Sequence, residues 1–123
     1  MHRKHVLTVT ALTEGGTGLL LLLVPLIPIR LLLGLDHVAP EALPIARIAG
    51  AGLIAWAVAC WGGRNHPAVQ PGVLLGVLVY DVAAAGILAH AGSVMHLAGI
   101  LLWPAVGLHA GLAAWCAYSL SRK

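Results

Sequence analysis

Four long apolar stretches, interrupted by few charges, constrain the fold of this 123-residue chain more than any other feature of its sequence. A helix needs about 20 mostly apolar residues to cross the hydrocarbon core of a bilayer. The sequence therefore predicts an all-α fold, an up-down bundle of four transmembrane helices that forms one domain over residues 1–123. The predicted spans are residues 6–27, 43–62, 72–90 and 95–118.

The composition favours lipid as the surrounding medium. Only 9% of the residues are charged and 60% are hydrophobic, whereas soluble domains carry about 25% charged residues. A soluble domain of this size needs a large polar surface, so we expect an integral membrane protein with membrane lipid as its first partner. The formal net charge of +3 is too small to indicate a nucleic-acid partner.

The segment between the first two predicted spans is not expected to cross the membrane. Pro28, Gly34 and Pro40 interrupt it, and it is too short to cross a bilayer. Its leucine and isoleucine side chains predict a short segment that lies at the membrane interface.

The distribution of Lys and Arg predicts the orientation of the bundle. Membrane proteins carry an excess of these residues on the cytoplasmic side. Five lie in the two termini and the 63–71 loop, and two lie toward the opposite side, so we expect both termini to be cytoplasmic. The five are Arg3, Lys4, Arg64, Arg122 and Lys123, and the two are Arg30 and Arg47.

Three titratable residues on three predicted spans fall at one depth. Glu14 lies eight residues into the first span, Asp81 nine residues into the third, and His109 nine residues from the end of the fourth. At a rise of about 1.5 Å per residue, all three are roughly 12–13 Å from the cytoplasmic ends. Ionisable groups in a membrane face the bundle interior and pair, so we predict a buried polar layer. Thr17, one turn from Glu14, can add a hydroxyl, whereas Tyr80 is expected to point to another face of its helix.

Arg47 lies deeper than this layer, at roughly 22 Å from the cytoplasmic end of its span. Its side chain can reach inward toward Glu14 or extend outward to the interface. An inward Arg47 needs an anionic partner because arginine keeps its charge. We therefore include Arg47 with the polar layer as a candidate.

Two functional hypotheses use this layer, and one structural interpretation competes with both. The groups can simply align the helices. They can instead belong to a small accessory subunit or binding module that accepts a polar ligand or a lipid head group. Alternatively, they can serve a metal- or proton-coupled redox or transport protein, in which His109 exchanges protons. The absence of a phosphate loop, a Gly-x-Ser-x-Gly motif and a His-Glu-x-x-His motif favours a non-enzymatic role, and no catalytic residue is assigned.

A second group of histidines is expected at the opposite end of the bundle. His90 and His96 flank the predicted link between the last two spans, and His37 follows Asp36 in the first outer loop. Imidazoles and a carboxylate can bind a divalent metal such as Zn²⁺ or Cu²⁺, or they can be hydrated loop residues. A haem is disfavoured, because His90 and His96 would point along one side instead of clamping it from opposite faces.

Glycine is abundant and patterned. Gly72 and Gly76 form a G-x-x-x-G motif, and so do Gly107 and Gly111. Small residues let helices approach closely in lipid. The motifs predict tight packing within one bundle, or contact with a second copy or with a larger membrane complex.

Four stretches, "TEGGTGLLLLLVP", "ARIAGAGLIAWAVACW", "LVYD" and "LLWPAVGLHAGLA", cover most of the spans. In these stretches the chain resembles a group of small, uncharacterised bacterial four-helix integral membrane proteins. The resemblance implies a multi-pass protein of the bacterial inner (plasma) membrane, and it implies that Glu14, Arg47 and His109 form one unit. The group often has asparagine in place of Asp81, so the resemblance implies neither a second carboxylate nor an activity.

Overall fold

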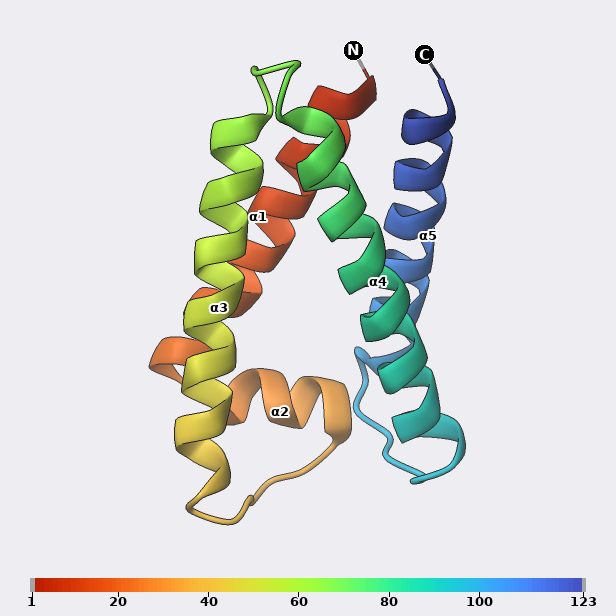
Figure 1. Cartoon of the computed structure of the whole chain (residues 1–123). Helices are drawn as coiled ribbons and strands as arrows, with labels where there is room; N and C mark the ends of the chain where they lie inside the picture. Colours follow the sequence, from red (N-terminus) through yellow and green to blue (C-terminus); the bar gives the residue numbers. More distant parts are fainter. Residues whose placement is uncertain (1, 123) are drawn as a thin grey trace.

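Two antiparallel helix pairs make up most of the computed structural model, which describes residues 2–122 (Figure 1). The helix α1 packs mainly against α3, and α4 packs mainly against α5. Within the described residues the chain is all-helical, as predicted. The helices are α1 (His2–Leu23), α2 (Leu26–Leu33), α3 (Ala42–Gly63), α4 (Gln70–Ser93) and α5 (Leu102–Ser121).

Three of these helices, α1, α3 and α4, are long and apolar enough to cross a membrane. They correspond to the first three predicted spans with small shifts at their ends. Large apolar side chains remain exposed on their outer faces, for example Ile48 on α3 at 72% and Ile87 on α4 at 69%. Exposed apolar surface of this extent matches contact with lipid and not with water.

Both described ends of the chain and the α3–α4 connection lie at the same end of the molecule (Figure 1). Arg3 in the first turn of α1 joins the two ends, because its Nε donates to the Ser119 carbonyl at 3.1 Å and its Nη2 to the Arg122 carbonyl at 2.9 Å. These bonds satisfy carbonyls that have no donor within α5. Lys123, used above to predict orientation, lies outside the described residues.

The first span ends earlier than predicted, at Leu23 instead of residue 27. Pro25 lacks a backbone N–H and cannot continue the helix. The chain turns there into α2, which lies across the end of the molecule opposite the termini (Figure 1). The short segment expected between the first two spans is therefore a separate helix that packs against α1 and α5.

The fourth predicted span was wrong at its start. The helix α4 continues to Ser93, and α5 begins at Leu102 instead of residue 95. The intervening segment folds onto α2, where Leu101 N–H donates to the Leu31 carbonyl at 2.8 Å and Gly99 lies directly against the backbone of Leu31 and Leu32. A Cβ atom at Gly99 would collide with that backbone, so the contact depends on glycine.

Glycine also sets the closest approach between α1 and α3. A Cβ atom added to Gly18 would lie 2.7 Å from the Gly50 carbonyl oxygen, and one added to Gly50 would lie 2.7 Å from the Gly18 carbonyl oxygen. The two glycines of the α5 motif, Gly107 and Gly111, have no such neighbour within 4 Å in the described chain. The helices α1 and α3 therefore pack closely at Gly18 and Gly50, whereas no other part of the described chain covers the α5 motif.

Candidate functional site

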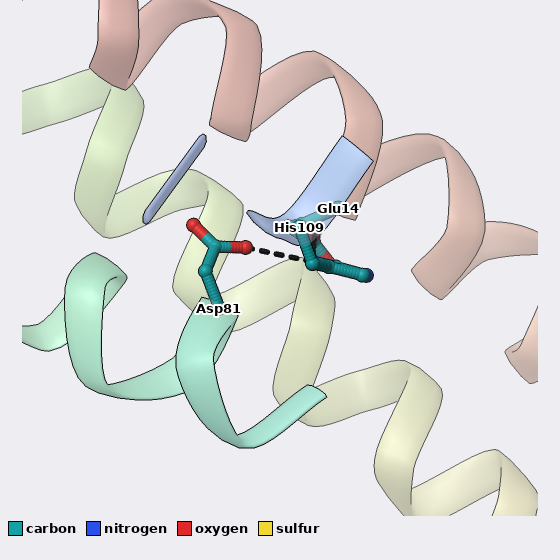
Figure 2. A group of neighbouring side chains, drawn as sticks. All are labelled: Glu14, Asp81 and His109. Atoms are coloured by element: carbon teal, nitrogen blue, oxygen red, sulfur yellow. Dashed lines mark hydrogen bonds and ion pairs between the residues drawn. The ribbon is translucent and has the colours of Figure 1, made fainter. Parts of the chain in front are cut away.

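Glu14 from α1, Asp81 from α4 and His109 from α5 meet in the interior of the molecule (Figure 2). Their exposed fractions are 3%, 0% and 9%. One ligand atom from each lies within 4.8 Å of the others. We refer to these three residues as the acid–imidazole cluster. The structure thus brings together the three side chains that were expected at one depth.

The shortest contact in the cluster joins His109 to Asp81. His109 Nδ1 lies 2.7 Å from Asp81 Oδ1, as the dashed line in Figure 2 marks. An ionised carboxylate only accepts hydrogen bonds, so an ionised Asp81 holds the imidazole proton on Nδ1. The second ring nitrogen, Nε2, is then the one that can accept a hydrogen bond or bind a ligand when His109 is neutral.

Glu14 is bonded differently. Its Oε2 accepts a hydrogen bond from the Tyr80 hydroxyl at 3.1 Å, and its Oε1 lies 3.9 Å from His109 Nδ1, beyond hydrogen-bond distance. The rings of Tyr80 and His109 meet edge to face, with centroids 5.7 Å apart. The contact of Tyr80 with Glu14 was not predicted, because it depends on the long side chain that carries the hydroxyl across to α1 from the position next to Asp81.

A cavity of about 400 Å³ adjoins the cluster; it is partly open to the surface, and Leu32 of α2 is among the residues that line it. Its wall is apolar except near the cluster, where Glu14, Tyr80 and His109 line it together with Thr13 and Thr17. Asp81 is fully buried and is not among the lining residues. The apolar lining consists of Leu21, Leu32, Leu53, Ala83, Ala84, Ile87, Leu88, Ala105 and Leu108.

Thr17, predicted as a site residue, lines this cavity. Its hydroxyl group, however, donates its hydrogen bond to the helix backbone and not to the cavity. Its Oγ1 donates to the Thr13 carbonyl at 2.9 Å, a bond that serine and threonine often make inside helices. The Thr17 oxygen keeps only its capacity to accept. Among the described residues, Asp81 Oδ2 and Thr10 Oγ1 are buried atoms near this level of the bundle with no hydrogen-bond partner.

Arg47 does not join the cluster. Its Nη1 donates to the Leu22 carbonyl at 2.7 Å, and the side chain is exposed. Leu22 lies in the last turn of α1, where carbonyls lack donors from within the helix. Within residues 2–122, no Lys or Arg nitrogen lies within 4.0 Å of a Glu14 or Asp81 oxygen.

The histidines at the other end of the molecule are not brought together. His37, His90 and His96 are all exposed, and Asp36 pairs instead with Arg30 at 3.0 Å. In the part of the chain that the structure describes, the acid–imidazole cluster is the single group of three or more His, Cys, Asp or Glu side chains close enough to share a cation.

The chain matches no protein-family model, no curated protein and no solved structure. Its function must be inferred from the chemistry of the acid–imidazole cluster and from the shape of the cavity beside it.

Proposed function

We propose that the chain is a small integral membrane binding module in which α1, α3, α4 and α5 cross the bacterial inner membrane with both termini in the cytoplasm. The cavity accepts a small amphipathic molecule from the bilayer. The acid–imidazole cluster receives the polar group of that molecule, and the apolar wall receives its body. The role is non-enzymatic.

One observation carries this proposal, namely an apolar cavity with polar groups at a single end. Binding sites for small molecules have volumes of roughly 300–1,000 Å³ and apolar walls with a few polar groups that orient the ligand. A cavity of about 400 Å³ beside Glu14, Tyr80 and His109 has this form. A cluster that merely aligned helices would need no cavity next to it, because helix association in lipid favours close packing.

Filling the cavity is expected to abolish binding. Ala84 on α4 lines it, and Ala84→Leu should occupy the space that a ligand needs. With 1-adamantanol, a compact apolar cage with one hydroxyl, we expect saturable binding to the wild-type protein in maltoside micelles. Isothermal titration calorimetry should show an affinity at least about tenfold lower for Ala84→Leu.

The matched control is Ala114→Leu, because Ala114 lies on an exposed face of α5. This variant should bind 1-adamantanol as the wild-type protein does. Equal affinity in all three proteins would contradict a ligand site in the cavity.

A metal- or proton-coupled redox or transport protein is the second candidate function, favoured by the spacing of the donor atoms. Two carboxylate oxygens and one imidazole nitrogen within 4.8 Å form a donor set suited to Zn²⁺ or Mn²⁺. For this candidate, equilibrium dialysis against either ion should leave about one metal per chain, lost in Glu14→Gln and retained in His90→Leu. Wild-type protein without stoichiometric metal would leave only the proton-coupled form, in which His109 exchanges protons.

We further propose that the module acts as an accessory subunit in a larger membrane complex or as a homo-oligomer. The bare Gly107–Gly111 face of α5 supports this, because no part of the described chain covers it and such faces allow close helix contacts in lipid. Recovery of the protein from its host in mild detergent as a lone monomer would count against this part of the proposal.

A further inference from the structure

The acid–imidazole cluster has more acidic than basic groups. It holds two carboxyl groups and one imidazole, so a protonated His109 can neutralise only one carboxylate. None of the described Lys and Arg side chains supplies a second positive charge, because Arg47, the nearest expected partner, is bonded to the Leu22 carbonyl. An unmatched carboxylate in a low-dielectric interior is costly. The cluster therefore lacks one positive charge or one proton.

The unmatched carboxyl group is that of Glu14. His109 Nδ1 lies 2.7 Å from Asp81 Oδ1 but 3.9 Å from Glu14 Oε1. The hydrogen bond that Glu14 does accept comes from the neutral hydroxyl of Tyr80. Glu14 also lines the cavity and Asp81 does not. The missing positive charge or proton is therefore on the cavity side of the cluster.

We infer that the ligand of the cavity is a lipophilic amine that places its ammonium group against Glu14, an assignment that rests on the proposed binding function. An ammonium group offers a positive charge and several N–H donors. Glu14 can accept one of them, while a protonated His109 continues to neutralise Asp81. A ligand that carries a carboxylate or phosphate would meet a like charge, and a neutral alcohol would leave Glu14 unmatched.

The size and wall of the cavity restrict the rest of the molecule. A volume of about 400 Å³ and a wall of leucine, isoleucine and alanine side chains suit a compact hydrocarbon body and not a long polar one. The cavity is apolar on the side away from Glu14. A second charge on the ligand would lie there without a polar partner, which is energetically costly. The ligand class is thus a monocation with a compact apolar body.

Three probes with one common cage test this inference. They are 1-adamantylamine, 1-adamantanol and 1-adamantanecarboxylate, titrated into the full chain in maltoside micelles at neutral pH with calorimetric detection. We expect the amine to bind at least about tenfold more tightly than the alcohol, and the carboxylate to show no saturable binding.

Glu14→Gln should bring the affinities of amine and alcohol to within about threefold of each other while leaving alcohol binding in place. Glu41→Gln is the matched control, since Glu41 is an exposed carboxylate just before α3, and it should keep the preference for the amine. Tyr80→Phe, which retains the Glu14 carboxylate and removes its neutral donor, should bind the amine at least as tightly as the wild-type protein does.

The outcomes separate the inference from the function on which it rests. Wild-type protein that binds the alcohol or the carboxylate as tightly as the amine would overturn the amine assignment and leave the cavity as a ligand site. A full preference for the amine in Glu14→Gln, or its loss in Tyr80→Phe, would also overturn the assignment. No saturable binding of any probe by folded wild-type protein would overturn both the assignment and the proposed function.

Discussion

Replacement of His109 by leucine is expected to lower the free energy of unfolding by about 3 kcal/mol, because it strands a buried carboxylate. Asp81 is 0% exposed, and within the described chain its one side-chain hydrogen-bond partner is His109. Polar contacts between transmembrane helices average only about 0.6 kcal/mol. A loss several times larger would therefore measure the cost of an unpartnered Asp81 and not the contact itself.

The measurement is unfolding in mixed micelles at increasing dodecyl sulfate, followed by circular dichroism. His90→Leu is the control, because His90 is exposed in the last turn of α4, and its effect should stay within about 0.5 kcal/mol. The double variant Asp81→Leu, His109→Leu should recover to within about 1 kcal/mol of wild type, since apolar residues can replace a buried pair. A double variant as unstable as His109→Leu alone would refute this explanation.

The second large effect is expected at the crossing of α1 and α3, where Gly50→Ala should cost about 3 kcal/mol. The added methyl group would lie 2.7 Å from both the Gly18 carbonyl oxygen and the Leu22 backbone nitrogen. Backbone atoms in a helix cannot move aside as a side chain can, so the two helices must separate. Because α1 and α3 form one of the two main helix pairs, this separation should loosen the packing of the whole molecule.

Gly52→Ala provides the comparison within the same helix. A Cβ atom at Gly52 would meet no heavy atom within 4 Å, and alanine favours a helix over glycine by roughly 0.5–1 kcal/mol. This variant should be as stable as the wild-type protein or more stable in the same unfolding assay. Similar losses in both variants would mean that the Gly18–Gly50 approach does not hold the pair together.

The membership of the acid–imidazole cluster follows from a simple count along the chain. Depth in a helical bundle is the number of residues from a helix end multiplied by a nearly constant rise. Glu14, Asp81 and His109 have almost equal counts, and the energetic cost of an isolated charge in lipid favours their pairing. Neither step requires knowledge of which helices are neighbours.

The count fails where position depends on rotation about the helix axis or on the reach of a side chain. Arg47 had two alternatives from the sequence, inward or outward, and the exposed side chain takes the outward one. The free carbonyl of Leu22, which exists because Pro25 ends α1, accepts its hydrogen bond there. Tyr80 was not placed with the cluster, because only its helix face and not the reach of its side chain was considered. The start of α5 was placed too early, because the contact of Gly99 with α2 is not encoded in the hydropathy of residues 95–101.

Hydropathy and helical rise, both properties of the linear chain, were enough to determine an all-helical protein with long apolar helices and a buried level of acidic and imidazole groups. The tertiary structure alone decided that α2 contributes to the wall of a cavity beside that level. It also decided that Tyr80 donates a hydrogen bond to Glu14 and that Arg47 bonds to the Leu22 carbonyl instead of the cluster. The physical reason is that lipid exposure acts on each residue separately. Cavities and hydrogen-bond partners arise from the mutual rotation and separation of helices, which packing at sites such as Gly18 and Gly50 determines.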